Sequence, residues 1–505
     1  MTTPEDSRPG PGFALFGLVT GLATGAGVYA IQQYWVDEST KQRLAPTALI
    51  AVAVFGSVLL LLAERGARLK AVLPAALVAA LVAGPTYFLL VAADPNANLS
   101  EFPLFFWFFI AAPLAGFLLT TLAKATILDG APPPYRSVFF HGLTLPLIAG
   151  GAKLFALLAL VLIFAWAALL KAMNVDFFHK LFQEPWFMLP FLGGVGGLSI
   201  ALMRGMESVL GALRFLLLLF CRIAMPITAV FSLTFIGVLA ANGTDAIFSQ
   251  PYPGAIMLGL AFAGMLIFNG VYQNGEGGPP ALWLRLSTIV ALATFPAYAG
   301  LAAYALWLRI GEYGLTPARI AGAAMNGLAA LYSVVCLAGL LTELNYWNGK
   351  RWMPLVAPFN TAMAALWIIV LLVLASPLVN PWALSAKSQE LRLATGKVSA
   401  DEFDFGYLRF KLGAYGEAAL DRLEALHSHP EAAKIRAGVA KARAASNEWF
   451  YDFPDEAPVE AEAPSEAGAS APPGPMQLQL HPEGADLGDD DAPATEDQPE
   501  ADPQQ

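Results

Sequence analysis

Asp176, His179 and Glu184 are the residues whose types and spacing come closest to a metal-binding set. The three-residue step from Asp176 to His179 places both on one helical face, and Glu184 follows five residues later. Carboxylate and imidazole groups are common metal ligands. The same segment, DFFHKLFQEPWF, is also typical of an amphipathic helix whose aromatic side chains lie at the level of the lipid head groups. We favour the surface helix and predict no bound metal and no other cofactor.

Lys153 is a cation inside a long apolar run. A charge at that position in a membrane costs at least a few kcal/mol, unless the side chain extends to the head groups or finds a partner. Extension to the head groups is the interpretation we favour. The alternative places Lys153 in the interior of a helix bundle, as a group that carries a proton or holds an anion.

Two segments carry polar residues where apolar runs end, FNGVYQNGEGGPP and LRIGEYGLTPARI. In the second, Thr316 is placed to cap a helix that begins at Pro317. Arg319, in the first turn of that helix, opposes the helix dipole. Another interaction is therefore expected to hold it there. The candidates are an Arg309–Glu312 pair, a lipid phosphate or an anionic ligand. The candidate functional or structural corner comprises Asn269, Tyr272, Gln273, Arg309, Glu312, Tyr313, Gly314, Thr316, Pro317 and Arg319.

Several motifs with known chemistry are missing from the chain. It has no phosphate-binding GxxxxGK[ST], no zinc-binding HExxH, no GxSxG nucleophile and no CxxC pair. LGGVGGL follows no predicted strand and ends in no Lys-Ser/Thr, so we interpret it as helix packing. Gly17, Gly21 and Gly25 recur every fourth residue, which also predicts close approach by a neighbouring helix. The catalytic residues, if there are any, stay unknown.

The elements that position these residues are apolar runs of membrane-spanning length. A hydrocarbon core about 30 Å thick needs about 20 apolar residues per helix. The chain is 57% hydrophobic and 13% charged, far from a soluble domain. The runs predict about eleven spans, at 13–31, 46–63, 71–93, 101–123, 146–170, 185–203, 223–241, 254–272, 283–308, 317–341 and 356–376. Val209 to Phe220, broken by arginines, is expected to lie along the membrane surface, with Pro226 starting the next crossing.

The predicted architecture is an all-α, polytopic transmembrane helical bundle with four parts. Residues 1–12 form an N-terminal tail, 13–376 the transmembrane domain, 377–450 a small soluble helical segment, and 451–505 a disordered tail. The tail carries 15 of the 39 acidic residues and no Lys or Arg, which leaves a net charge of +5 on the rest. In the soluble segment, Ser399 and Glu402 predict a capping box, Gly413 and Gly416 a turn, and Pro430 a further helix.

Basic residues in short loops orient the bundle. With the N-terminus in the cytoplasm, cytoplasmic segments hold twelve Lys and Arg and the opposite loops hold six. A cytoplasmic N-terminus is therefore favoured. The odd number of spans then places the C-terminus outside, whereas Lys387, Arg392 and Lys397 argue for the cytoplasm, so the side of the C-terminus stays open.

Three sequence patterns resemble one known family. N-x-VYQ after one span, LWLRIxEYGLTPxRI after the next and SPLxNPxxLSAKSQ after the last are similar to a bacterial membrane family catalogued as domain of unknown function 4153. MNVDFFHKLFQEPWF is similar to it too, and the resemblance covers about residues 134–426. It implies a multi-pass protein of the bacterial inner membrane. It implies no activity.

Three functional hypotheses follow. The first is transport or envelope maintenance, without enzymatic activity, using a cavity near the fifth, eighth, ninth and tenth spans. The second is a transferase for lipid-linked substrates, with Asp37 and Glu38 as paired carboxylates. The third is a membrane anchor whose C-terminal helices recruit a protein partner. The lipid bilayer is the expected surrounding in each case, and nucleic acid is not expected as a partner.

Overall fold

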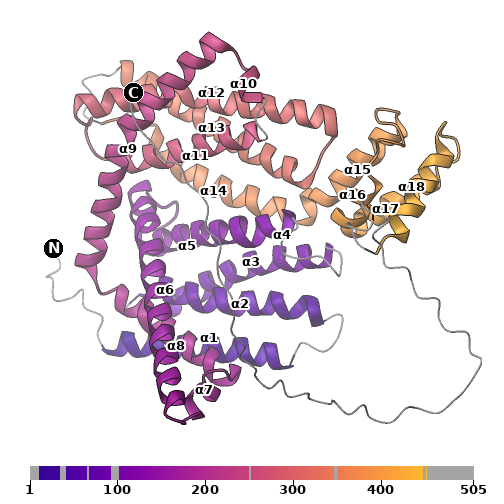
Figure 1. The fold of residues 1–505 in the computed structure, drawn as a ribbon. Helices are drawn as coiled ribbons and strands as arrows, with labels where there is room; N and C mark the ends of the chain where they lie inside the picture. Colours follow the sequence, from indigo (N-terminus) through magenta and orange to yellow (C-terminus); the bar gives the residue numbers. More distant parts are fainter. Residues whose placement is uncertain are drawn as a thin grey trace, which may run out of the picture. The chain divides into compact units, whose positions relative to one another are not determined.

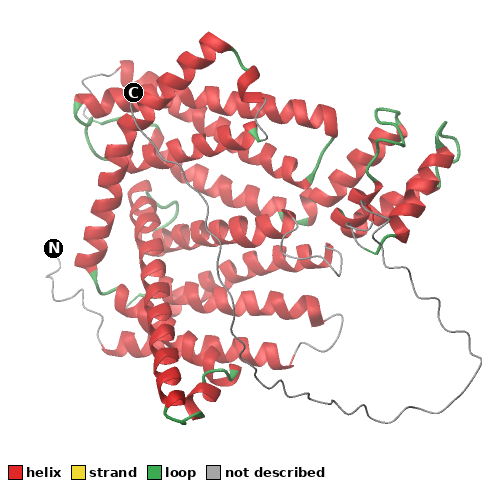
Figure 2. Cartoon of the chain, in the orientation of Figure 1, coloured by secondary structure: helices red, strands yellow, loops and turns green. Residues whose placement is uncertain are grey.

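The computed structural model describes residues 11–34, 41–64, 68–92, 102–248, 252–345, 351–446 and 451 of this 505-residue chain. Every regular element in this part is helical, which confirms the predicted all-α class (Figures 1 and 2). Residues 1–10 and the predicted acidic tail beyond Tyr451 lie outside the described residues, as do Asp37 and Glu38.

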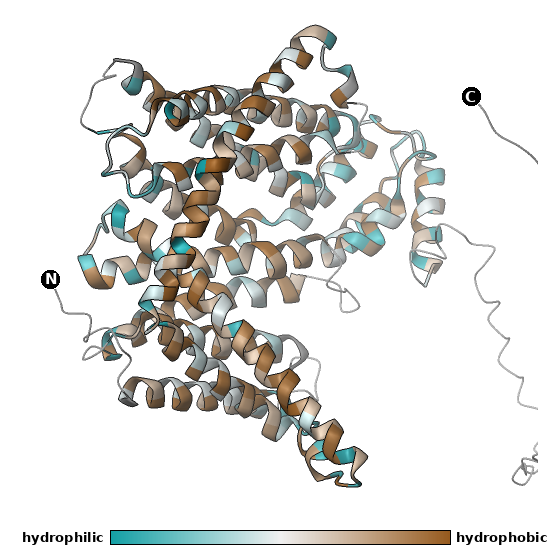
Figure 3. Ribbon diagram, turned by 60° about the vertical axis from the view of Figure 1, so that its left-hand side comes forward, coloured by the Kyte–Doolittle hydropathy of each residue, from teal (hydrophilic) through white to brown (hydrophobic). Residues whose placement is uncertain are grey.

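Eleven helical stretches of the described chain are long and apolar enough to cross a membrane, as predicted. Hydrophobic residues cover most of their length in Figure 3, as expected for helices in lipid. Two of the stretches are composite: the short helix η2 leads into α3, and α4, the π-helical turn η3 and α5 follow one another without a break. Their bounds are α1 Pro11–Tyr34, α2 Lys41–Leu62, η2 Arg68–Ala71, α3 Val72–Ala92, α4 Phe102–Phe106, η3 Trp107–Ala111, α5 Ala112–Asp129, α6 Tyr135–Ala172, α8 Pro185–Met203, α9 Glu207–Asn242, α11 Pro253–Tyr272, α12 Leu282–Tyr313, α13 Pro317–Asn345 and α14 Val356–Leu374.

The predicted division at Pro226, between a surface helix at Val209 to Phe220 and a separate crossing, is wrong, because α9 runs without interruption from Glu207 to Asn242 with Pro226 inside it. Proline is tolerated within membrane helices, where neighbouring groups satisfy the backbone that it frees. Arg214 does not need the membrane surface, since it donates a hydrogen bond of 2.8 Å to Thr144 Oγ1 and lies 4.4 Å from the ring centre of Phe140. Arg214 therefore marks a contact between helices and not a break.

The spans alternate in direction, and their termini collect at two ends of the bundle. At one end, which we call the Glu64 end, a cavity is lined by residues near the starts of α1, α6 and α9 and the ends of α2, α5 and α8. At the other, the Gly314 end, the start of α11, the end of α12 and the start of α13 line a second cavity. This alternation is what eleven successive crossings require.

Helices α6 and α9 run obliquely across the other spans (Figures 1 and 3). With 38 and 36 residues they are about 57 and 54 Å long at 1.5 Å per residue. A helix this long exceeds a hydrocarbon core of about 30 Å, and tilting is one way to fit it. Helix α14 packs against α13 and also against α5 and α6, which joins the early and late spans.

The two predicted glycine patterns pack against each other, in α1 and α8. A Cβ on Gly17 would lie 2.6 Å from the carbonyl oxygen of Gly197 and 2.7 Å from Cβ of Ala201, which is shorter than real contacts allow. Gly21 meets Gly193 and Gly25 meets Leu189 in the same way. Only glycine permits this backbone contact, so LGGVGGL is a packing surface.

The last helices begin close to the final span. The short helix η4, Pro377–Val379, leads into α15, Pro381–Ala394, whose start is capped by Asn380 through hydrogen bonds of 3.0 and 3.1 Å from two backbone N–H groups. Trp382 is fully buried, and α15 packs against α13. Residues 1–455 form one compact unit, to which all of the described residues belong.

Helices α16 Phe405–Lys411, α17 Gly413–Glu424 and α18 Ala432–Ala444 complete this unit. The predicted capping box at Ser399 is wrong: the Asp404 side chain caps α16, accepting a hydrogen bond of 2.8 Å from Tyr407 N–H. Ser399 instead bonds Glu402 within a turn. Gly416 does not bracket a turn but lies inside α17, where it contacts the backbone of Leu408. The sequence pattern found the helices but misplaced the starts of the first two by a turn or more, whereas the helix predicted to open at Pro430 begins at Ala432.

Candidate functional site

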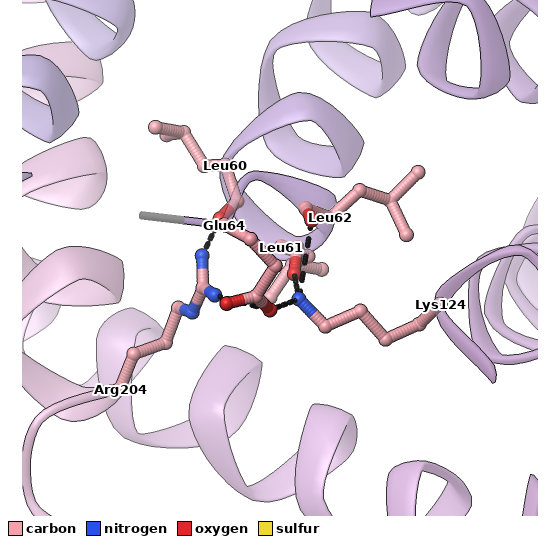
Figure 4. Close-up of polar contacts among 6 residues, drawn as sticks. All are labelled: Leu60, Leu61, Leu62, Glu64, Lys124 and Arg204. Carbon is pink, nitrogen blue, oxygen red and sulfur yellow. Dashed lines mark hydrogen bonds and ion pairs between the residues drawn. The ribbon is translucent and has the colours of Figure 1, made fainter. Parts of the chain in front are cut away.

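The Glu64 end contains a cluster of three charged side chains from three different spans (Figure 4). Lys124 of α5 and Arg204, which follows α8, both form ion pairs with Glu64 Oε1, the Arg204 pair at 3.1 Å. The side chains of Lys124 and Arg204 are only 5% and 14% exposed, and that of Glu64 is 32% exposed. Charges this well covered within a membrane bundle are costly unless they are paired, as these are.

The same two cations close the carboxyl end of α2. Lys124 Nζ donates hydrogen bonds to the carbonyl oxygens of Leu61 and Leu62, at 3.2 and 3.1 Å, and Arg204 donates to Leu60 O at 2.7 Å. The last carbonyls of a helix lack partners within the helix and carry partial negative charge. Lys124 and Arg204 therefore serve as a C-cap supplied by neighbouring helices.

Beside this cluster lies a cavity of about 290 Å³. Its polar lining includes His141 and Thr144 of α6 and Glu207 of α9, with Phe13 of α1 opposite. The Arg204 guanidinium lies 4.8 Å from the ring centre of Phe13. Two covered cations and a histidine thus face one space together with two carboxylates, and the cations can hold a small anion by charge-assisted hydrogen bonds. The Thr144 hydroxyl already donates to a backbone carbonyl.

Sequence analysis missed this cluster. It counted Lys124 and Arg204 only as topology signals and did not single out Glu64. The available signal was Lys124, which lies within the apolar run LLTTLAKATIL because α5 continues to Asp129, past the predicted end of the span at residue 123. No local pattern indicates that residues 60 and 140 positions apart will meet.

The predicted corner falls into two separate places. Asn269, Tyr272 and Gln273 lie at the carboxyl end of α11, beside the start of α12, whereas Arg309 to Arg319 lie beside the start of α11. The two groups are therefore at opposite ends of these helices.

Asn269 is the centre of a buried polar network among four spans. Its amide donates to Tyr332 Oη of α13 at 2.8 Å and accepts from Asn360 of α14 at 2.7 Å and from Tyr135 of α6 at 3.4 Å. Hydrogen bonds between membrane helices typically hold the helices together. Tyr272 Oη donates to Met353 O at 3.0 Å, and Gln273 ends α11 with a φ of 58°.

The YGLTP segment forms the tight turn between α12 and α13 that the sequence predicted. Gly314 has a φ of 75°, and the Thr316 hydroxyl accepts a hydrogen bond of 3.3 Å from Arg319 N–H. Arg319 is held by the Gly314 carbonyl, to which it donates at 2.6 Å, and by the Tyr313 ring, 5.5 Å from its guanidinium carbon. Among the described residues, no ion pair joins Arg309 to Glu312.

Helix α15 binds this turn with one face of the SAKSQELR sequence. Ser388 Oγ accepts from Leu315 N–H at 3.0 Å, Ser385 donates to Leu315 O at 2.9 Å, and Gln389 donates to Tyr313 O at 2.9 Å. Arg392 donates to Glu312 O. Two of the motifs quoted above thus form a single contact, which their separation in sequence concealed.

Lys153 and the proposed metal set lie apart from these sites. Lys153 is on the exposed face of α6 and not in the bundle interior. Asp176 precedes the short helix α7, Phe177–Leu181, and His179 Nε2 lies 3.1 Å from Gln183 Nε2. Within the described ranges no group of three or more His, Cys, Asp and Glu residues could hold a metal ion. Asp176, His179 and Glu184 are all exposed or half-buried on the surface of the bundle.

A buried ion pair, Arg285 of α12 with Glu343 of α13, was also not predicted. Their side chains are 8% and 3% exposed. Arg285 entered the sequence analysis only as a loop charge, yet it lies within α12, one turn from its start.

No family model matches the chain, and no match is found among curated proteins or solved structures. The interpretation therefore depends on the eleven apolar helices and the geometry of their contacts. Together these identify a multi-pass membrane protein in contact with the lipid bilayer.

Proposed function

We propose that this protein is a transporter for a small anionic solute and that the cavity at the Glu64 end is its binding site. The observation that carries the proposal is the convergence of Lys124 and Arg204 on the single carboxylate of Glu64, beside a cavity of about 290 Å³. Ionisable residues inside a membrane bundle are costly and commonly mark a substrate or ion pathway.

The charge balance favours an anion over a cation. One ammonium and one guanidinium group face one carboxylate in the cluster, and the α2 carbonyls take up part of the excess positive charge. The other carboxylate that lines the cavity, Glu207, is paired with Arg214 at 3.8 Å. Glu64 is the most exposed of the three side chains. A carboxylate or phosphate solute that enters the cavity would compete with Glu64 for the same two cations, and His141 would offer a further hydrogen bond.

We also propose the side of the membrane toward which the cavity opens. Arg68, Lys70, Lys124 and Arg204 all lie near the Glu64 end, and the excess of basic residues in the corresponding loops favours the cytoplasm. The resemblance to the family of domain of unknown function 4153 adds the bacterial inner membrane. In this orientation the cavity would open toward the cytoplasm, and the Gly314 end would face the other side.

Purified protein in liposomes tests the proposal. Currents on a solid-supported membrane are recorded after concentration jumps of inorganic phosphate, acetate and succinate. We expect the wild type to respond to at least one of these anions, Lys124→Gln to lose the response, and Lys153→Gln, which removes an exposed lysine of α6, to keep it.

Glu64→Gln tests the direction in which the anion affinity changes. Since it removes the competing carboxylate, we expect the half-saturating anion concentration to fall, although the variant loses an ion pair. If the cluster only closed α2, both Lys124→Gln and Glu64→Gln would lower the melting temperature, and the currents would not change in opposite directions. Absence of current from folded wild-type protein with all three anions would contradict the proposal.

A further inference from the structure

The second cavity, at the Gly314 end, has a volume of about 420 Å³ and lies among α11, α12 and α13. It occupies part of the region where sequence analysis expected a cavity, although α6, the predicted fifth span, does not line it. Its walls are mostly small and apolar, and they include Gly254, Ala302, Ala305 and Gly322. A volume of this size is ordinary for a ligand pocket.

Two arginines line this cavity where α12 ends and α13 begins. Arg309 is exposed, and apart from the Tyr313 ring, 5.7 Å from its guanidinium carbon, it has no partner in the described part of the chain. Arg319 is half-buried and uses one nitrogen for Gly314 O. Neither arginine is paired with a carboxylate of a described residue. The mouth therefore offers guanidinium donors without a compensating negative charge.

Asn326 is a polar group deeper in the same cavity. Its side chain is more than nine-tenths buried, and its Oδ1 has no hydrogen-bond partner among the described residues. It follows Arg319 by seven residues, which is about 10 Å along α13. An unpartnered amide in this position costs free energy unless something in the cavity bonds it.

Two exposed aromatic side chains indicate at which depth in the membrane the mouth of the cavity lies. Tyr252, which lines the cavity, and Trp307, nearly two turns before the end of α12, are 73% and 67% exposed. Exposed Tyr and Trp are typical of the level of the lipid head groups. The arginines thus lie where head groups are found, and the apolar walls extend from there toward the hydrocarbon core.

From these observations we infer that the cavity binds an amphiphile: its anionic head group lies at Arg309 and Arg319, its apolar chain lies along the small-residue walls, and a hydroxyl or N–H group beside the chain donates to Asn326 Oδ1. Phosphate and carboxylate head groups share the chemistry that a guanidinium recognises. The site is separate from the charged cavity at the Glu64 end and does not depend on the transport proposal.

The test uses full-length protein that has been stripped of lipid in a maltoside detergent. Its melting temperature is measured with added phosphatidylglycerol, phosphatidylcholine, oleate, 10-hydroxystearate and inorganic phosphate. We expect phosphatidylglycerol or oleate to raise the melting temperature of the wild type, and phosphatidylcholine and inorganic phosphate to have little effect. The response to phosphatidylglycerol relative to oleate identifies the head group.

Two variants and a control locate the effect. Arg309→Gln should need about tenfold more lipid for half of the rise, the loss expected for one charge-assisted hydrogen bond. Arg136→Gln is the control, because it removes an exposed arginine that does not line this cavity. Asn326→Leu should raise the melting temperature without lipid and abolish the extra rise that 10-hydroxystearate, whose hydroxyl can donate to Asn326 Oδ1, gives over oleate.

Three results would overturn the inference. The first is an equal lipid response in the wild type and in Arg309→Gln. The second is a response to inorganic phosphate alone that matches the lipid, since the apolar walls would then play no part. The third is an Asn326→Leu variant that is more stable yet keeps the extra rise with 10-hydroxystearate, since Asn326 would then be only an unpaired polar residue.

Discussion

Replacing Gly197 by alanine should weaken the bundle, because α1 and α8 meet at this residue by backbone contact. An added Cβ would lie 2.9 Å from Gly21 Cα and 3.1 Å from the Gly17 carbonyl carbon, and closer still to the Gly17 oxygen. Ordinary contact begins near 3.4 Å, so the helices must separate by at least 0.5 Å at Gly21 and by more at Gly17. Overpacking of this kind typically costs about 1–3 kcal/mol.

The neighbouring residue supplies a matched control. Gly196 lies on the same helix, and a Cβ there would have no atom within 4 Å. Both substitutions gain the helix propensity of alanine over glycine, about 1 kcal/mol. The difference between the two variants therefore isolates the packing cost, which corresponds to a ratio of about 5 to 150 in the unfolding equilibrium constant.

The assay is reversible unfolding in mixed micelles of dodecyl maltoside and increasing SDS, followed by circular dichroism and tryptophan fluorescence. Gly197→Ala should unfold at a lower SDS fraction than Gly196→Ala, and Gly196→Ala should equal or exceed the wild type. Equal midpoints for the two variants would refute close backbone packing of α1 on α8.

Four further predictions concern other contacts. Arg285→Leu and Glu343→Leu should each lower the free energy of unfolding in the same SDS assay by about 3–5 kcal/mol, because each leaves a buried charge without its ion-pair partner, and the double variant should be close to the wild type; additive losses would contradict this. Gly314→Ala should cost about 1–2 kcal/mol, since φ is 75° and the new Cβ would lie 2.7 Å from Arg392 Cδ, whereas Gly311→Ala, with open space, should cost nothing measurable. A chain that ends after Gly396 should have a higher melting temperature than one that ends before Ala383, because only the first retains the contacts of Ser385, Ser388 and Gln389 with the turn between α12 and α13. The chain that ends before Ala383 therefore cannot test partner recruitment by the C-terminal helices, whereas the chain that ends after Gly396 can. Burial raises the pKa of Tyr407, so its contribution to stability is complete below the unfolded value of about 10 and declines at higher pH, and Tyr407→Phe should flatten the alkaline decline in melting temperature; an unchanged decline would show that Tyr407 does not contribute.

The spans could be predicted because each depends on its own residues. The predicted run 185–203 coincides with α8, and ten other runs overlap the remaining spans. The error at Val209 to Phe220 has a physical cause. A local sequence pattern treats Arg214 and Pro226 as breaks in a helix. In the structure Arg214 donates a hydrogen bond to Thr144 of α6, and α9 continues through Pro226.

The corner was predicted in part. Thr316 does bond the N–H of Arg319, and Gly314 does adopt the left-handed conformation that a tight turn favours. What held Arg319 was left open, because the Gly314 carbonyl and the Tyr313 ring become close only when the turn closes. The contact of α15 with the same turn was not anticipated, since about 70 residues separate Leu315 from Ser385.

The sequence by itself determined that the chain is an all-helical membrane protein with eleven spans, because hydrophobic run length is a local property that the bilayer converts directly into helices. It also indicated that Gly17, Gly21 and Gly25 serve packing. Only the tertiary structure decided which helices meet, and therefore that Glu64, Lys124 and Arg204 share one site while the predicted corner residues divide between two ends. Charges on separate spans carry no mark of their partners, since their pairing arises from the packing of helices and not from any spacing along the chain.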